Sequence, residues 1–201
     1  MITVHNASFH LNNMEILHSI YLNLHPGSAH LLTGHNGCGK TMLLRLLAGL
    51  IRPTSGEIVF SKRPSYGVII ENPSFLMHES AYYNLKFLAD INRKIGKQTI
   101  DAYLKHFGLY DKRNKKVKAL SLGMRQRLAL AQAFMENPNI LLLDEPFNAL
   151  DKQYRALLLE DLFSAKESGK TIVIASHGDT EADSNIYDQI HIMENGTIVQ
   201  N

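Results

Sequence analysis

The chain has 201 residues, of which 45% are hydrophobic, so it can bury a substantial core without disulfides or metals. Its 21 basic and 19 acidic residues give a formal net charge of +2, which is too small to indicate nucleic acid as a partner by itself. The single cysteine, Cys38, excludes an intrachain disulfide, and we expect neither a signal peptide nor a membrane span, because no apolar run approaches the roughly 18 residues that a span needs.

The first seventy residues predict short β-strands and one helix. Apolar and alternating runs predict strands over residues 2–9, 16–24, 29–33, 57–60 and 67–70. Asn12-Asn13 is expected to form the turn between the first two strands. An amphipathic helix is predicted over residues 41–50, with Pro53 and Gly56 ending it.

The pattern becomes helical over about residues 74–118. Apolar residues such as Ile100, Leu104 and Phe107 recur there at helical spacing, which predicts a mostly helical insert. The end of this region, residues 112–118, carries five basic residues in seven. A solvated connector explains that run better than a specific anion or partner site.

The remainder of the chain alternates helices with short apolar strands. Helices are expected from Ser121 to about Asn137 and over residues 152–167. Strands are expected over residues 140–143, 171–175, 189–193 and 197–200, the last two flanking the hairpin dipeptide Asn195-Gly196. This alternation predicts a single α/β domain over residues 1–201, with its core at about 1–73 and 119–201. We expect a mostly parallel core sheet and an added N-terminal antiparallel β layer.

A glycine-rich loop joins the third predicted strand to the first predicted helix. It matches the phosphate-binding P-loop pattern with the residues Gly34, His35, Asn36, Gly37, Cys38, Gly39, Lys40 and Thr41. Glycines let backbone N–H groups converge on phosphate oxygens, and the following helix directs its positive end at the same anion. We expect Lys40 to reach the β- and γ-phosphates of a nucleoside triphosphate, and Thr41 to ligate Mg²⁺.

Two carboxylates, Asp144 and Glu145, follow the apolar run at residues 140–143. Such a pair after a strand is common by itself, but its position about a hundred residues after a P-loop favours a catalytic role. Asp144 is the expected second metal ligand, acting through water. Glu145 is the expected base that polarises the attacking water.

Three further motifs identify the family that the chain resembles. Residues 120–127, with the sequence LSLGMRQR, resemble the signature loop of ABC-type ATP-binding cassettes. Residues 148–151 resemble the D-loop of that family, and Ser176-His177 resembles its switch-histidine loop. The order and spacing match the family over about residues 2–200. The resemblance implies a P-loop NTPase fold of the ABC type and an ATPase that uses ATP and Mg²⁺.

The resemblance also implies how the motifs work together. In ABC cassettes two nucleotide domains pair head to tail, and each ATP lies between one P-loop and the partner's signature loop. Ser121, as a helix N-cap, and Gly123 would contact the partner's ATP, while His177 would contact the γ-phosphate within its own subunit and Asp151 belongs to the D-loop. We expect a homodimer without nucleic acid, held on the cytoplasmic face of the membrane by separate permease subunits. Residues 71–88 would supply their docking groove.

Some residues depart from the family's usual pattern. Glu71 stands where a glutamine is usual, and it adds a negative charge beside the γ-phosphate while still offering an oxygen to Mg²⁺. Leu122 and Met124 replace a glycine and a glutamine of the signature. Leu11 stands near the position of the aromatic residue that stacks on adenine, with Phe9 or His10 as possible substitutes.

The sequences Ile70-Glu71-Asn72-Pro73 and Ser121–Met124 resemble the branch of the family that serves export of, and immunity to, peptide antibiotics of the bacitracin and lantibiotic type. That resemblance implies export. The transported molecule itself would be selected by the permease subunits.

Cys38 and the function class each have an alternative. Beside Lys40 at a helix N-terminus, the Cys38 thiol is expected to react readily, although it also fits a small residue filling a variable position. Instead of a transport ATPase, the chain could be an ABC ATPase acting on ribosomes or nucleic acid, although it shows one cassette and no sustained heptads. A P-loop kinase would not explain the signature loop or the D-loop.

Overall fold

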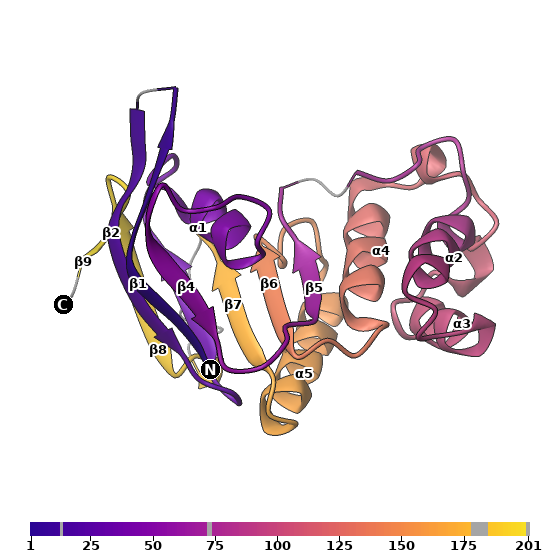
Figure 1. Cartoon of the computed structure of the whole chain (residues 1–201). Coiled ribbons are helices and arrows are strands. Elements are labelled where there is room, and N and C mark those ends of the chain that lie inside the picture. Colours follow the sequence, from indigo (N-terminus) through magenta and orange to yellow (C-terminus); the bar gives the residue numbers. More distant parts are fainter. Residues whose placement is uncertain (13, 72–73, 178–184, 200–201) are drawn as a thin grey trace.

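The computed structural model describes residues 1–12, 14–71, 74–177 and 185–199. Some sequence predictions include residues outside these ranges: Asn13 of the first turn, Asn72-Pro73 of the export-type motif and of the docking groove, and Gln200 of the last strand. Within the described ranges, the chain forms two β-sheets, five α-helices and two short 3₁₀ helices (Figure 1).

The smaller sheet is the antiparallel N-terminal layer that the sequence predicts. Its strands lie in the order β2-β1-β4, with the bounds β1 (Ile2–Leu11), β2 (Met14–Leu24) and β4 (Ser55–Phe60). β1 is antiparallel to both neighbours, and its register with both shifts next to Asn6, which has a φ of 50°. Such irregularities increase the twist of a strand.

The larger sheet is the mostly parallel core sheet. Its strand order is β5-β6-β7-β3-β8-β9, and every neighbouring pair is parallel except β8–β9. The bounds are β3 (Ala29–Thr33), β5 (Tyr66–Ile69), β6 (Ile140–Asp144), β7 (Thr171–Ala175), β8 (Gln189–Glu194) and β9 (Thr197–Val199). Asn195 and Gly196, with φ of 44° and 81°, form the predicted hairpin turn between the last two strands.

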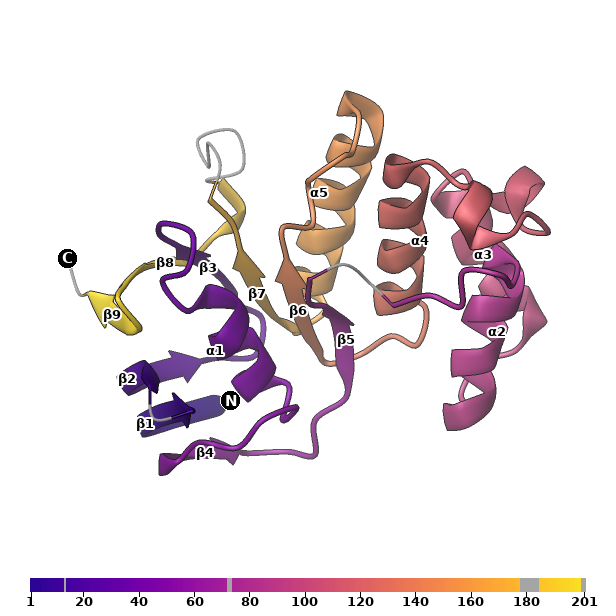
Figure 2. The same cartoon turned by 90° about the horizontal axis from the view of Figure 1, so that it is seen from above.

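Helices cover both faces of the core sheet. α1 (Lys40–Leu47) lies between the two sheets, and α5 (Lys152–Glu167) covers the opposite face of the core sheet (Figure 2). Because side chains alternate along a strand, Leu32 of β3 packs in the core with α1, whereas its neighbour Leu31 packs in the core with α5. Every residue of β6 and β7 is buried, as the continuous apolar runs predict.

The first helix ends earlier than the sequence predicts. The amides of Gly49 and Leu50 donate to the carbonyls of Leu46 and Arg45, and Gly49 has a φ of 71°. This is the pattern of a Schellman cap, so Gly49 ends the helix. The prediction that the helix continues to residue 50 and ends at Pro53 and Gly56 is therefore wrong.

The helices between β5 and β6 gather at the end of the molecule away from the antiparallel sheet (Figure 1). They are α2 (Ala81–Asn92), α3 (Lys97–His106), the 3₁₀ helices at Tyr110–Lys112 and Val117–Ala119, and α4 (Leu122–Phe134). α4 ends before the predicted Asn137, which has a φ of 51° and precedes Pro138. The helices in the described part of the chain all fall short of the length and apolarity that crossing a bilayer requires.

Candidate nucleotide-binding and catalytic site

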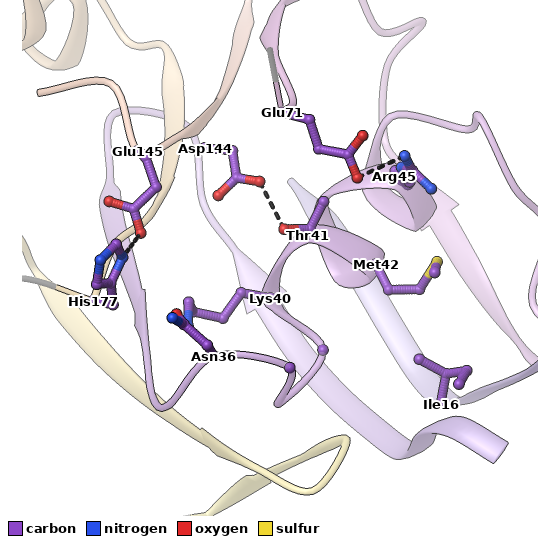
Figure 3. A pocket seen from close by; sticks show the side chains of 12 residues that line it. Ile16, Asn36, Lys40, Thr41, Met42, Arg45, Glu71, Asp144, Glu145 and His177 are labelled. Carbon is purple, nitrogen blue, oxygen red and sulfur yellow. Dashed lines mark hydrogen bonds and ion pairs between the residues drawn. The ribbon is translucent and has the colours of Figure 1, made fainter. Parts of the chain in front are cut away.

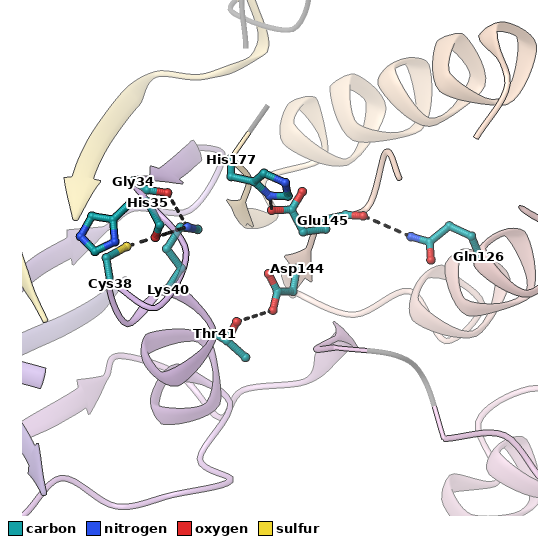
Figure 4. Close-up of polar contacts among 9 residues, drawn as sticks. All are labelled: Gly34, His35, Cys38, Lys40, Thr41, Gln126, Asp144, Glu145 and His177. Carbon is teal, nitrogen blue, oxygen red and sulfur yellow. Dashed lines mark hydrogen bonds and ion pairs between the residues drawn. The ribbon is translucent and has the colours of Figure 1, made fainter. Parts of the chain in front are cut away.

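The glycine-rich loop lies between the carboxyl end of β3 and the start of α1. Gly34, Gly37 and Gly39 have φ of 145°, 83° and 107°, a backbone conformation that side chains with a Cβ rarely adopt. The Lys40 ammonium donates to the carbonyl oxygens of Gly34, at 2.6 Å, and His35, at 3.1 Å (Figure 4). The ammonium is thereby held over its own loop, where the helix N-terminus also favours an anion.

Thr41 and Asp144 come together although they are 103 residues apart in sequence. The Thr41 hydroxyl donates to Oδ2 of Asp144 at 2.7 Å. Asp144 ends the buried strand β6, and burial raises the pKa of its carboxyl group, an effect that Glu145 reinforces. Hydrogen bonds from the Thr41 hydroxyl and the Glu71 amide act in the opposite direction.

These two oxygen-bearing side chains fit a magnesium ion. Mg²⁺ prefers oxygen ligands and is usually bound by one or two protein groups together with substrate phosphates and water. Thr41 and Asp144 offer such a pair beside the loop, and Glu71 offers a further oxygen. The described residues contain no cluster of three His, Cys, Asp or Glu side chains that could hold a metal ion without such help.

Glu145 and His177 form the second polar pair of the site. The Glu145 carboxylate accepts a hydrogen bond from Nδ1 of His177, as Figure 3 shows. Glu145 has a φ of 50°, and its amide donates to the carbonyl of Ala175 at 2.9 Å. A left-handed backbone at a non-glycine residue costs free energy and is often found at functional sites.

Glu71 forms the third pair, with Arg45 of α1. The Arg45 guanidinium donates to Oε1 of Glu71 at 2.8 Å. Glu71 follows β5 and has a φ of 57°. The sequence reasoning assigned Glu71 to the site but missed Arg45, whose place four residues after Thr41 on one helix face was the signal that could have found it.

All three pairs border one pocket of about 360 Å³. Of the described residues, its lining comprises Ile16, Asn36, Gly37, Gly39, Lys40, Thr41, Met42, Arg45, Glu71, Asp144, Glu145 and His177 (Figure 3). Ile16 and Met42 lie on the opposite side of Thr41 from Glu145 and His177. Ile16 and Met42 form the apolar end of the pocket, on the same side of Thr41 as the ion pair of Arg45 with Glu71.

The apolar end differs from what the sequence suggested. Leu11 is 48% exposed and is not part of the described lining. Phe9 packs against the hydrophobic core, and Nδ1 of His10 lies 3.0 Å from the Thr54 hydroxyl, so neither candidate substitute lines the pocket. Ile16 and Met42 are the residues that sequence reasoning missed. Met42 directly follows the P-loop, but Ile16 carries no sequence signal.

Three predicted P-loop contacts do not belong to the described lining: Gly34, His35 and Cys38. Cys38 is only 1% exposed and packs in the core that contains α1. Its sulfur lies 3.8 Å from the Lys40 ammonium. The expectation that this thiol reacts readily is not supported, because a reagent must first reach a buried sulfur atom.

The residues of the signature loop and the D-loop lie outside this pocket. Ser121 caps α4 as predicted, since its hydroxyl accepts from the amide of Met124 at 3.3 Å. A Cβ on Gly123 would lie 2.6 Å from the carbonyl oxygen of Ala149 in the D-loop, so this close approach requires a glycine at position 123. Asp151 caps α5 by accepting from the amide of Tyr154 at 3.0 Å.

The relatives found by comparison with known proteins agree with one another on a single family. A family model described as ABC transporter matches residues 17–148. The uncharacterized ABC transporter ATP-binding protein YybJ of Bacillus subtilis strain 168 is 41% identical over 186 residues, which cover 88% of this chain and 85% of the relative. The lantibiotic transport ATP-binding protein SrtF of Streptococcus pyogenes is 35% identical, covering 88% and 80%. The spermidine/putrescine import ATP-binding protein PotA of Fusobacterium nucleatum is 34% identical, covering 99% and 56%.

Solved structures show the same fold. The dimeric ATP-binding cassette MJ0796, in a post-hydrolysis state bound to ADP and Pi, matches with a TM-score of 0.88. The match covers 100% of this chain and 97% of that chain at 21% sequence identity. At that identity the likeness concerns the fold alone, and it agrees with the predicted α/β cassette.

Proposed function

Since the chain belongs to the ABC transporter family, as an ATP-binding subunit with ATPase activity, we propose that it couples hydrolysis of Mg-ATP to substrate movement through separate membrane-spanning permease subunits. One observation carries this proposal. Lys40 and Thr41 of the P-loop, Asp144 and Glu145 at the end of β6, and His177 after β7 border a single pocket although they come from distant parts of the chain. The carboxyl ends of β3, β6 and β7 meet at this edge of the parallel sheet, which is where α/β folds bind ligands.

The proposed chemistry follows from what each group can do. Lys40 and the loop amides would hold the phosphates, and Ile16 and Met42 would contact the base or ribose at the apolar end. Thr41 and Asp144 would hold Mg²⁺, which supplies positive charge against the β- and γ-phosphate oxygens. Glu145 would accept a proton from the attacking water.

His177 is well placed to orient that base. Its Nδ1 already donates to the Glu145 carboxylate, and in the protonated imidazolium Nε2 would carry the second N–H, which could donate to the γ-phosphate. A positioned carboxylate and a donor aimed at the developing charge are the two elements that water-mediated phosphoryl transfer needs. We therefore propose Glu145 as the base and His177 as its orienting partner.

Completion of the site is proposed to require a second copy of the chain. Ser121 and Gly123 at the start of α4 would contact the γ-phosphate that lies in the partner's pocket. ATP would then join two positively polarised helix ends, and loss of the γ-phosphate would let the pair open. Asp151, which caps α5 beside this region, would lie at the same interface.

The insert at residues 74–118 is proposed as the subdomain that docks on the permease. In support, Tyr83, Phe87 and Ile91 of α2 are 44%, 48% and 64% exposed and lie at helical spacing along one face. An apolar face of this kind suits a helix of the permease subunits on the cytoplasmic side of the membrane. If Phe87→Ser and Ile91→Ser together leave copurification with the permease unchanged, this face is not the docking surface.

The direction of transport and its cargo are proposed from relatives. The SrtF relative carries a lantibiotic transport name, which supports export of peptide antibiotics. The PotA relative carries an import name, so this part of the proposal needs its own test. Deletion of the coding gene should sensitise cells to a lantibiotic if the chain serves export or immunity, and unchanged sensitivity to several such peptides would argue against it.

Phosphate release measured with purified protein tests the core of the proposal. Wild-type protein should hydrolyse ATP in the presence of magnesium, and Glu145→Gln should reduce kcat at least about a hundredfold while nucleotide binding persists. Glu160→Gln, which removes an exposed carboxylate on α5, is the matched control. Hydrolysis at the wild-type rate by Glu145→Gln would contradict the assignment of the base.

A further inference from the structure

The three carboxylates of the pocket are each held by a donor from another element. The Thr41 hydroxyl holds Asp144, Nδ1 of His177 holds Glu145, and the Arg45 guanidinium holds Glu71 (Figure 3). Thr41 and His177 already have places in the proposed chemistry. Arg45 has none, although it borders the same pocket.

Arg45 and Glu71 are carried by different elements, Arg45 by α1 and Glu71 by the segment after β5. Arg45 lies four residues after Thr41, so both side chains project from the same face of α1. Glu71 stands in a left-handed backbone conformation after β5, where its amide hydrogen-bonds the Asp144 carboxylate while its own carboxylate bonds Arg45. Glu71 thus touches the candidate metal ligand through its backbone and the arginine through its side chain.

The negative charge of Glu71 disfavours the binding of metal-free nucleotide, and Arg45 can neutralise that charge. A second carboxylate next to Asp144 favours a divalent cation but repels the phosphates of a nucleotide that arrives without one. Lys40 does not neutralise Glu71, since its ammonium faces the carbonyls of Gly34 and His35. The cation paired with Glu71 is Arg45.

We propose that Arg45 is a positioning residue for Glu71: it neutralises this carboxylate while the pocket holds no metal and releases it when Mg-nucleotide binds. The inference rests on the proposed binding of ATP. Exposure makes such an exchange feasible, because the Arg45 and Glu71 side chains are 35% and 57% exposed. Exposed ion pairs contribute little net free energy, so a bound metal can replace the arginine as the partner of Glu71.

Binding of mant-ATP, a fluorescent ATP analogue, tests the inference without reference to hydrolysis. The measured quantity is the magnesium enhancement, defined as the Kd in EDTA divided by the Kd in excess magnesium. Arg45→Met should raise this enhancement about tenfold over wild type, because the freed Glu71 repels metal-free nucleotide and attracts the metal. Arg45→Lys, which keeps the charge, should stay within about twofold of wild type.

The same substitution in a Glu71→Gln background separates this pairing from a simple loss of charge. Loss of one positive charge from the pocket affects nucleotide binding in both backgrounds. This general effect therefore cancels when the change in magnesium enhancement caused by Arg45→Met is compared between the two backgrounds. In Glu71→Gln the enhancement should change less than about twofold. Arg52→Met, at an exposed arginine outside the described pocket lining, is the matched control for net charge.

The outcomes separate the inference from the proposed function. Equal effects of Arg45→Met in the two backgrounds would overturn the inference, even with normal nucleotide binding. Absence of mant-ATP binding by wild-type protein under both conditions would instead overturn the proposed function. Should Arg45→Met fail to fold, as judged by thermal unfolding, Arg45→Gln carries the same prediction.

Discussion

Backbone strain and side-chain pairing coincide at the residues of the candidate site. Glu71 and Glu145 both have positive φ, and both use their carboxylates to bind a cationic or donor side chain from another element. A left-handed backbone at such residues costs of the order of 1 kcal/mol, which the surrounding contacts must offset. Neither conformation could be predicted from the sequence, because glutamate carries no preference for it.

Substitution of His177 tests the role of a single side chain of the site. His177→Ala should lower kcat about a hundredfold with a much smaller change in KM, because it removes the group that orients Glu145 but keeps Lys40 and the loop amides that are proposed to hold the phosphates. Steady-state phosphate release measures both constants. His78→Ala, at an exposed histidine outside the described pocket lining, is the control, and equal kcat for the two variants would remove His177 from the mechanism.

Among the secondary-structure elements, α4 forms hydrogen bonds that brace the turn carrying Glu145. The Gln126 side chain of α4 donates to the carbonyl oxygen of Pro146 at 3.0 Å and approaches that of Glu145 at 3.4 Å (Figure 4). Ala149 of the same segment also has a positive φ, of 59°, and it approaches Gly123 closely. The helix proposed to contact the partner's ATP is thus bonded to the segment that carries Glu145, the proposed base of this subunit.

Gln126→Glu tests this brace. It keeps the shape of the side chain but removes both N–H donors and sets a negative charge against two carbonyl oxygens. We expect kcat to fall about tenfold while the Kd for mant-ATP stays within about twofold. Gln153→Glu, on the exposed surface of α5, makes the same chemical change elsewhere, and a similar loss in both variants would show that Gln126 does not position Glu145.

A histidine pair between β3 and β8 predicts how stability depends on pH. His30 is buried, with Nε2 at 2.7 Å from the Ser28 hydroxyl and Nδ1 at 3.1 Å from Nε2 of His191. The Ser28 hydroxyl donates to the carbonyl of His25, so it accepts from His30, and His30 in turn accepts from His191. Burial, reinforced by His191, lowers the pKa of His30 from 6.5 to about 4, and burial also lowers the pKa of His191.

Between pH 6.5 and about 4 the unfolded chain binds a proton at His30 that the folded chain does not, so stability is present in full above pH 6.5 and declines as the pH falls. His30 alone should cost about 2 kcal/mol of unfolding free energy at pH 5 relative to pH 7.5. Urea unfolding of wild type and His30→Gln at both pH values measures this. The loss on acidification should be smaller in the variant, and an equal loss would contradict the assignment.

The sequence predicts elements better than their ends or their side-chain partners. The bounds of β3, β7 and α5 agree with prediction, because continuous apolar runs and a capping aspartate are local signals. The end of α1 was missed, since the Gly49 cap outweighs the more distant Pro53. The spacing of Arg45 from Thr41 places it on the site-facing side of α1, but its ion pair with Glu71 joins residues 26 apart, and no local pattern reports a contact that the packing of α1 against the core sheet creates.

At the scale of the whole molecule, the motifs separate into two groups. The pocket gathers the P-loop, Asp144, Glu145 and His177, whereas Ser121 and Gly123 start a different helix and do not line it. One protomer therefore offers a phosphate site without the second helix end that the proposed mechanism needs. Head-to-tail pairing of two copies, which the resemblance to ABC cassettes implies, would bring the two groups together.

The mass of Glu145→Gln protein, measured by size-exclusion chromatography with light scattering, shows whether ATP joins two copies of this chain. With Mg-ATP the mass should double from the monomer's 22.6 kDa, and it should return to the monomer value without nucleotide. Ser121→Glu in the same background should stay monomeric with ATP bound, because a negative charge would face the γ-phosphate. A monomer in Mg-ATP with hydrolysis blocked, at protein concentrations up to about 100 μM, would contradict the claim that ATP joins two copies of this chain.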